Sequence, residues 1–420
     1  IMMKDLWISI FHTSFSKIYN ILLGIVSLII TARLLGPEGR GVLAAVISWT
    51  ALLATFSSLS LGQVSQYYIQ TQKKDNWFPA LFGSLVFLAS ALFIVVSIIV
   101  VIIYLLTEGK VFGDIKASLL LFGLLMLPFS IWELYGSYLL MSIGKLKLYN
   151  IAQITGRTVN LLTIVLLVYV VGLGVEGALF GTVLGQIIIS LIGIRQLWKK
   201  AGSKLIIEKS IIYSLLKGAG ELHLNTVGAF LLSQVNIILL NYYSTKAAVG
   251  WYQFSFQLIS VMLVLPQAVS MVFFSKMAGL TPDLLWKSQK KIIIQIMAVM
   301  LIMMAMAYCV SPKIIILLAG RSFYSSIVVF QQLLPVVIGM SLAQLMATQW
   351  IGRGKFVIAS ILTITAAIIN ILIGIIFIPK FGMQGAIWAS LLSLALFTPF
   401  AQIIFAFVCN KLERQVQRLP

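Results

Sequence analysis

The chain has 420 residues, of which 60% are hydrophobic and only 10% are charged, whereas soluble domains carry about 25% charged residues. Apolar runs long enough to cross a bilayer recur along its whole length. The composition therefore excludes an ordinary soluble domain and predicts an all-α polytopic membrane protein. The net charge of +19 is assigned to membrane topology, so no nucleic-acid partner is expected.

The hydrophobic pattern predicts twelve transmembrane helices, six in each half of the chain. The first six lie near residues 14–36, 40–68, 78–106, 116–142, 148–171 and 176–198. The second six lie near residues 211–243, 247–275, 286–311, 326–350, 356–378 and 383–409. No segment between these spans is long enough to form a separate soluble domain.

The two halves of the chain repeat a short pattern. A Gly-Lys pair ends at Lys145 and again at Lys355, and an asparagine follows fifteen residues after each lysine, at Asn160 and Asn370. Each half holds an even number of spans, so both halves enter the membrane in the same orientation. A pseudo-twofold axis along the membrane normal is then expected to relate them.

The repeat predicts two six-helix lobes joined by a basic cytoplasmic connection. The boundaries are 1–200 for the N-terminal lobe, 201–210 for the linker and 211–420 for the C-terminal lobe. Two like-oriented bundles would leave a cleft between them, and that cleft is the expected binding site.

Orientation follows from the distribution of lysine and arginine between the loops. Of the 30 such residues, 19 fall on the side that carries both termini and 8 on the other side. Because cytoplasmic loops carry the excess of Lys and Arg, both termini are predicted to lie in the cytoplasm.

One face of the first predicted span is polar. Residues at steps of three or four along it are Lys17, Asn20, Gly24, Ser27 and Thr31. A lipid-facing helix gains nothing from such a stripe, so we expect the stripe to face protein or a water-filled space. For Gly24 and Ser27, close packing against a neighbouring helix is an equally good explanation.

Arg157 lies about nine residues inside the fifth predicted span, on the same helical face as Asn150, Gln153 and Asn160. A charge at this depth costs roughly 2.5–3.5 kcal/mol on insertion scales, so it needs a partner or a purpose. One interpretation is a cation for a phosphate-bearing substrate, because the guanidinium is forked and permanently charged. The alternative is a structural ion pair with Glu133, which lies at a similar depth in the preceding span.

Ionisable groups also cluster near the start of the seventh span. Lys217 and Glu221 are one helical turn apart, and His223 follows them. Lys217 would suit an anionic group in the cleft, while an intrahelical pair with Glu221 near the membrane surface is the simpler account. Glu133, Glu221 and His223 are the groups that would couple transport to ions.

The eighth span carries neutral hydrogen-bonding side chains at helical spacing, among them Gln253 and Gln257. Along a cleft such groups would suit the hydroxyls of a sugar. They also suit ordinary hydrogen bonds between helices, and both interpretations stand.

The sequence contains no G-x-x-x-x-G-K-[ST] loop for nucleotide phosphates and no metal-ligand or nucleophile constellation. We therefore expect no catalytic residue, no metal, no cofactor and no enzymatic activity. Movement of a substrate would be driven by a proton gradient, a sodium gradient, the membrane potential or consumption of the product on the far side.

Three motifs carry a resemblance to a known family. They are ARLLGPEGRGVLAAV at Ala32–Val46, the Gly-Lys pairs with their following asparagines, and the Gly-x-x-Gly-Ala entry to spans six and twelve. Together they resemble the Wzx-type oligosaccharide flippases of the multidrug/oligosaccharidyl-lipid/polysaccharide (MOP) exporter superfamily, and the resemblance covers the whole chain.

The resemblance implies two six-helix lobes around a V-shaped cavity, lined largely by spans 1, 2, 7 and 8. A polyprenyl-diphosphate-linked oligosaccharide would enter from the cytoplasmic leaflet, and alternating access would expose it to the outer leaflet. The implied setting is the bacterial cytoplasmic (inner) membrane, where O-antigen, lipopolysaccharide or capsule is assembled. Its lipids, the polysaccharide polymerase and other glycan-assembly proteins would be partners.

Under this hypothesis the diphosphate is bound by charged and amide side chains and the sugars by neutral ones. The residues assigned to the head group are Lys17, Asn20, Arg157 and Lys217. Those assigned to the sugar are Gln253 and Gln257.

Two alternatives remain open. A cation-coupled multidrug exporter of the same superfamily predicts that Glu133→Gln or Glu221→Gln abolishes gradient-driven efflux. A non-transporting membrane scaffold for glycan assembly would need no wet cleft, so the polar stripes argue against it.

Overall fold

A computed structural model describes residues 2–71, 77–276, 282–352 and 356–416. The described residues form helices and short turns, with no β-strand among them. The chain divides into two compact units, Ile1–Val227 and Gly228–Pro420. We call them the first and second units and describe each by itself.

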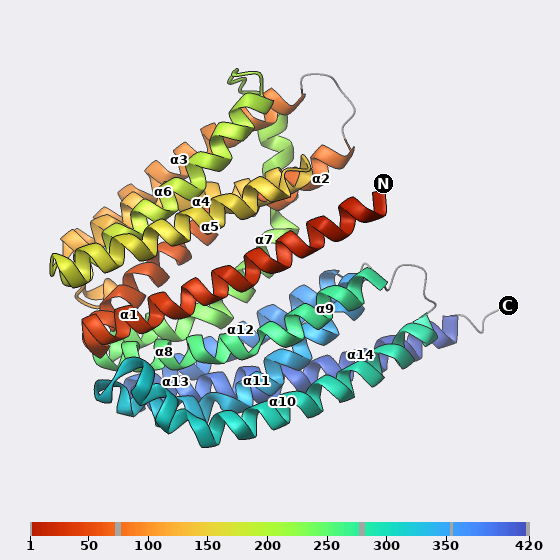
Figure 1. Ribbon diagram of the computed structural model, residues 1–420. Helices are drawn as coiled ribbons and strands as arrows, with labels where there is room; N and C mark the ends of the chain where they lie inside the picture. Colours follow the sequence, from red (N-terminus) through yellow and green to blue (C-terminus); the bar gives the residue numbers. More distant parts are fainter. Residues whose placement is uncertain (1, 72–76, 277–281, 353–355, 417–420) are drawn as a thin grey trace. The chain divides into compact units, whose positions relative to one another are not determined.

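The first unit is built from six helices and the beginning of a seventh. They are α1 (Met2–Ser58), α2 (Leu61–Thr71), α3 (Trp77–Thr107), α4 (Ala117–Ser142), α5 (Leu146–Ile164), α6 (Gly174–Lys200) and the first half of α7 (Lys209–Tyr243). A π-helical segment, Val165–Val170, extends α5. Within this unit α4, α5 and α6 pack side by side (Figure 1).

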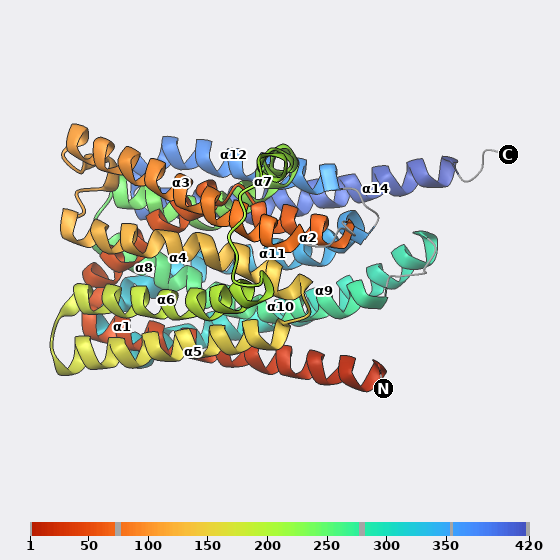
Figure 2. The ribbon, with the colours of Figure 1, turned by 90° about the horizontal axis from the view of Figure 1, so that it is seen from above.

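The second unit takes the rest of α7 and seven further helices. They are α8 (Lys246–Met262), α9 (Val264–Lys276), α10 (Pro282–Ala319), α11 (Tyr324–Gly352), α12 (Phe356–Phe381), α13 (Met383–Ser390) and α14 (Thr398–Val416). A second π-helical segment, Leu391–Phe397, joins α13 to α14. α11 is central here, because it packs against α8, α9, α10 and α14 (Figure 2).

Within the described residues, eleven helices are long and apolar enough to cross a membrane. The first of them, Ile18–Ser58, holds two predicted spans, because the backbone at Gly36 is not helical. The remaining ten follow the other predicted spans in order, as Trp77–Thr107 follows 78–106. The predicted all-α, twelve-span membrane fold is therefore confirmed.

A sharp kink separates the first two predicted spans. Gly36 has φ 65° and ψ −177°, a conformation that glycine adopts without the penalty other residues incur, and Pro37 follows it. Arg40 Nη1 donates a hydrogen bond of 3.2 Å to Thr31 Oγ1. Nine residues of straight helix would separate these positions by about 14 Å, so the bond requires the chain to turn back at Gly36.

The second predicted span, 40–68, contains a break that the hydrophobic pattern did not predict. Leu59 and Ser60 lie between α1 and α2 with φ 46° and 54°, in the left-handed region that residues other than glycine seldom occupy. The Ser60 N–H donates to Ser58 Oγ at 3.3 Å, which replaces part of the interrupted helical hydrogen bonding.

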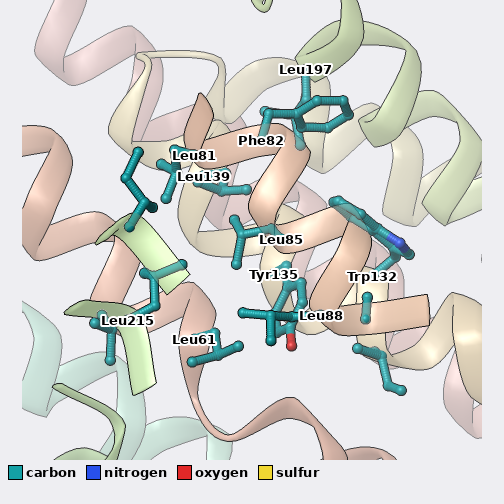
Figure 3. Packing of buried hydrophobic residues seen from close by; sticks show 14 of the residues in the cluster. Leu61, Leu81, Phe82, Leu85, Leu88, Trp132, Tyr135, Leu139, Leu197 and Leu215 are labelled. Carbon is teal, nitrogen blue, oxygen red and sulfur yellow. The ribbon is translucent and has the colours of Figure 1, made fainter. Parts of the chain in front are cut away.

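One hydrophobic cluster joins α2, α3, α4, the end of α6 and the start of α7. Figure 3 shows Phe82 of α3 near Trp132 of α4, and the two ring centroids are 5.7 Å apart. Leu197 of α6 and Leu215 of α7 are fully buried in the same cluster. Because α7 enters the first unit through Leu215 and Ala219, the units divide at Val227, further along the chain than the predicted linker at 201–210.

Candidate functional site

The polar face predicted on α5 forms a hydrogen-bonded chain with α4 and α6. Gln153 Nε2 donates to Glu133 Oε1 at 2.6 Å, and Gln186 Nε2 of α6 donates to Glu133 Oε2. Arg157 Nε donates to Gln153 Oε1 at 3.2 Å, from the next turn of α5. Three helices thus place a carboxylate, two carboxamides and a guanidinium in one connected group, which we call the α4–α6 polar chain.

Glu133 and Arg157 form no direct ion pair in this chain, because Gln153 lies between them and bonds to both. Each of the two carboxylate oxygens of Glu133 accepts one amide N–H. A cavity of about 10 Å³, the size of one water molecule, adjoins Glu133 and Ser190. Glu133 is therefore fixed mainly by neutral partners.

Arg157 is exposed at the surface of the first unit, whereas Gln153 is only 4% exposed. Gln153 accounts for all the hydrogen bonding that the described residues offer the guanidinium. The side chain is thus anchored at Nε, and its two terminal nitrogens lie beyond that anchor. This geometry suits a forked, permanently charged donor for an oxyanion.

The polar stripe of α1 runs beside α5. The Tyr19 hydroxyl lies 3.2 Å from Thr158 Oγ1, within hydrogen-bonding distance, so the positions next to Asn20 and Arg157 meet. Asn20 is half-buried, and its Oδ1 has no hydrogen-bond partner among the described residues. The side chain of Lys17 lies outside the described residues.

The structure also buries a cation that the charge distribution along the sequence assigned to an outer loop. Arg40 is 7% exposed and donates to Thr31, the last residue of the predicted stripe. The sequence feature that could have indicated this burial is the position of Arg40 between Gly39 and Gly41, just after Gly36-Pro37. A turn at these residues can direct a nearby charged side chain inward. Arg40 secures the kink of α1.

The α7 candidates lie in a different part of the first unit. Lys217 is exposed, and the neighbouring Gly218 packs on Val64 of α2. His223 Nδ1 lies 3.2 Å from Ser60 Oγ, at the break between α1 and α2, and Thr226 Oγ1 accepts a hydrogen bond from the same hydroxyl at 3.0 Å. The side chain of Glu221 lies outside the described residues. His223 is therefore engaged in fastening α7 to the broken span.

Gln253 and Gln257 belong to the second unit, where they contact each other. Gln253 Nε2 donates to Gln257 Oε1 at 2.8 Å, and both side chains are half-buried. The opposite face of α8 is buried on α11, with Ser255 Oγ donating to the Ser326 carbonyl at 3.0 Å. The two glutamines thus lie on the less buried face of α8.

Sequence reasoning missed a buried polar group in the second unit. Asn236 Nδ2 donates to Ser390 Oγ at 2.9 Å and to the Tyr252 hydroxyl at 3.2 Å, and that hydroxyl lies 2.8 Å from Ser390 Oγ. Single polar residues spaced far apart in the sequence gave no pattern that would reveal this group.

The predicted repeat residue Asn370 is fully buried on α12, and neither the nitrogen nor the oxygen of its carboxamide has a hydrogen-bond partner among the described residues.

Among the described residues no group of His, Cys, Asp and Glu side chains could hold a metal ion. The described candidate groups are amides, hydroxyls, the Glu133 carboxylate, the His223 imidazole, the exposed Lys217 and the two arginines.

The fold has counterparts among solved structures. An inward-facing multidrug resistance MATE family transporter of the MOP superfamily matches with a TM-score of 0.73 at 14% identity, over 97% of this chain and 98% of that chain. The lipid II flippase MurJ in an inward closed conformation matches with a TM-score of 0.73 at 15% identity, over 96% and 90%. A MOP superfamily transporter from Pyrococcus furiosus matches with a TM-score of 0.56 at 16% identity, over 97% and 93%.

These similarities, with the eleven membrane-length helices, define a multi-pass membrane protein with the fold of the MOP transporters. The chain belongs to the polysaccharide biosynthesis protein family, whose model matches residues 6–278. The predicted membership of the MOP exporter superfamily is thus confirmed at the family level. No curated protein matches the sequence significantly.

Proposed function

We propose that this protein flips a polyprenyl-diphosphate-linked oligosaccharide from the cytoplasmic to the outer leaflet of the bacterial cytoplasmic membrane, for a surface polysaccharide such as O-antigen or capsule. The observation that carries the proposal is the match to the polysaccharide biosynthesis family on a transporter fold. The likeness to a lipid II flippase adds a fold precedent for lipid-linked cargo.

Arg157 is the residue to which we assign the diphosphate. It is exposed, held at Nε by Gln153, and carries a permanent charge. Asn20, on the helix packed against α5, would bind beside it, and Lys17 and Lys217 would supply further positive charge. Gln253 and Gln257 are proposed to bind sugar hydroxyls once their mutual hydrogen bond opens.

Reconstitution in proteoliposomes with a fluorescent lipid-linked oligosaccharide tests this assignment. A hydrogen bond to a charged group is worth about 1.5–3 kcal/mol, so Arg157→Ala should slow flipping by roughly ten- to a hundredfold. Arg157→Lys should retain part of the rate, because the charge stays and the fork is lost.

Arg195→Ala is the matched control, since Arg195 is exposed on α6 and takes no part in the α4–α6 polar chain. It should flip at the wild-type rate. A wild-type rate for Arg157→Ala and Lys17→Ala alike would remove the head-group site from the proposal.

A proton gradient, a sodium gradient or the membrane potential is proposed as the driving force. Selective ionophores, each collapsing one gradient during the flipping assay, would identify it. Equal rates under all of them would mean that flipping is driven by the cargo gradient alone.

A cation-coupled drug exporter is the second candidate, favoured by the likeness to a MATE transporter. It requires Glu133, Glu221 or His223 to exchange a proton or cation during transport. The two amide N–H donors on Glu133 favour a fixed carboxylate instead. Loss of gradient-driven drug efflux on Glu133→Gln, with oligosaccharide flipping absent in the wild type, would support the exporter.

A further inference from the structure

A pocket of about 660 Å³ opens in the first unit where three helices end. It is lined by the first residues of α3, including Trp77 and Phe78, by Ser142 at the end of α4, and by Lys200 and Lys204 at and after the end of α6. None of the residues of the α4–α6 polar chain lines it.

The turn after α6 gives this pocket a fixed wall. Ala201 is buried at the end of the helix, and Gly202 and Ser203 follow in the left-handed region, with φ 64° and 56°. The Gly202 N–H bonds to the Lys199 carbonyl at 3.1 Å, and the Ser203 N–H bonds to the Trp198 carbonyl at 3.1 Å. These bonds end the helix in a defined turn, so Lys200 and Lys204 are held on one side of the pocket.

Beyond the turn, the chain is pinned across α3. A Cβ at Gly83 would lie 2.7 Å from the backbone nitrogen of Ile206, so only glycine lets the segment pass this close. The Glu208 N–H also donates to Ser84 Oγ at 3.3 Å. The segment that joins α6 to α7 (Figure 2) is thus fastened to α3 rather than free to swing away from the pocket.

The electrostatics of the pocket favour an anion. Two lysines line it, and the described lining residues include no acidic side chain. The amino-terminal end of α3, whose first residues line the pocket, adds the positive end of a helix dipole.

Because three membrane-length helices begin or end at the pocket, we expect it to lie near the membrane surface. Trp77 begins one membrane-length helix, Ser142 ends another and Lys200 ends a third. Tryptophan is enriched at the headgroup level of membranes, and basic pockets between span ends bind anionic headgroups. Ile69 and Ile143 add apolar lining for the part of a lipid next to its headgroup.

From these features we infer that the pocket formed by Trp77, Lys200 and Lys204 binds the phosphate headgroup of an anionic phospholipid. This inference does not rest on the transported cargo, because the lipid would remain in its leaflet. The bound lipid would stabilise the ends of α3, α4 and α6 where they meet.

Binding of phosphatidylglycerol to the purified full chain tests the inference without a transport assay. Binding is measured by native mass spectrometry and by the lipid-dependent rise in the unfolding midpoint in detergent. Each basic residue near an anionic headgroup strengthens binding roughly fivefold, so Lys200→Gln/Lys204→Gln should weaken the tightest phosphatidylglycerol binding by about thirtyfold.

Lys145→Gln/Lys147→Gln is the matched control. It removes the same charge from two exposed lysines at the start of α5, and neither of them lines the pocket. This variant should bind phosphatidylglycerol like the wild type. Equal losses in the two double variants would show diffuse surface attraction and overturn the inference.

Two ligand controls decide what the site recognises. Phosphatidylcholine with the same acyl chains should give neither tight binding nor stabilisation, and a full effect would overturn the anionic assignment. Inorganic phosphate alone should also fail to stabilise the protein. A full effect of phosphate would replace the lipid with a free anion and overturn the inference.

Discussion

Gln153 determines how Glu133 and Arg157 coexist inside the first unit. Its amide nitrogen donates to the carboxylate and its amide oxygen accepts from the guanidinium, so neither charge needs to reach the other directly. A direct ion pair between Glu133 and Arg157 at membrane depth would incur a large desolvation cost. The Gln153 carboxamide instead hydrogen-bonds to both side chains, and Arg157 stays exposed.

Replacing Gln153 should therefore destabilise the protein. Gln153→Leu leaves Glu133 Oε1 and Arg157 Nε without their partner, and an unsatisfied buried polar group costs about 1–3 kcal/mol. We expect a lower unfolding midpoint in detergent, measured by the fluorescence of buried tryptophans. Ile151→Leu, at an exposed position of the same helix, should leave the midpoint unchanged, and an equal loss in both variants would contradict the bridging role.

For single residues, the sequence predicted which polar side chains share a helical face. It did not predict their hydrogen-bond partners. Helical spacing placed Arg157 and Gln153 on one face, and the structure confirms that they are hydrogen-bonded. Spacing could not show that Gln153 would lie between the charges, because that depends on side-chain reach across three helices. Arg40 was missed because the sequence predicts a turn at Gly36-Pro37 but does not show whether the charge after it is buried or exposed.

Helices α5 and α6 pack so closely that their backbones are in contact at Gly156 and Gly185. A Cβ at Gly185 would lie 2.7 Å from the Gly156 carbonyl oxygen, and one at Gly156 would lie 2.6 Å from the Gly185 carbonyl oxygen. α6 carries Gly177, Gly181 and Gly185 at steps of four, the small-residue spacing that lets membrane helices meet closely.

Even one methyl group at this crossing should force the helices apart. Gly185→Ala should lower the free energy of unfolding by about 1–3 kcal/mol, the usual cost of overpacking. Gly193→Ala on the same helix is the control, because its Cβ would meet Leu140 at an ordinary 3.6 Å. The unfolding midpoints of the two variants check this, and a tolerated Gly185→Ala would mean that the helices separate at little cost.

The elements themselves were largely predictable, because membrane-length apolar runs leave few alternatives. The Gly36-Pro37 break was predictable for a local reason, the conformation that glycine permits. The break at Leu59 and Ser60 was not, because neither residue is a usual helix breaker. Contacts from α7 hold that break in place, and they are distant in sequence.

For the whole molecule, the charge distribution makes a prediction that the fold leaves untested. With 19 basic residues on one side and 8 on the other, the α6–α7 connection should be cytoplasmic and the turn after α3 external. In a cysteine-free background, Glu108→Cys should react with a membrane-impermeant thiol reagent in intact cells. Ser203→Cys should react only after permeabilisation, and the reverse pattern would invert the assigned topology.

The paired Lys145 and Lys355 motifs predict that the chain has two like parts. What the repeat could not locate is the point where the parts divide. Leu215 and Ala219 are buried in the hydrophobic cluster of the first unit, and this burial joins the first half of α7 to that unit. The basic segment before α7 was predicted as the boundary because its charge indicates an exposed connection. Charge does not indicate how far along the chain the helices still pack within the first unit.

The Ser60 hydroxyl has a consequence for how the chain is made. Its partners, His223 and Thr226, lie 163 and 166 residues further along. The ribosome must therefore synthesise the following four predicted spans and the start of the seventh before this interrupted span is complete. Until then the nascent chain holds a broken helix whose polar break lacks its partners, so membrane insertases and chaperones would meet the first six spans in an unfinished form.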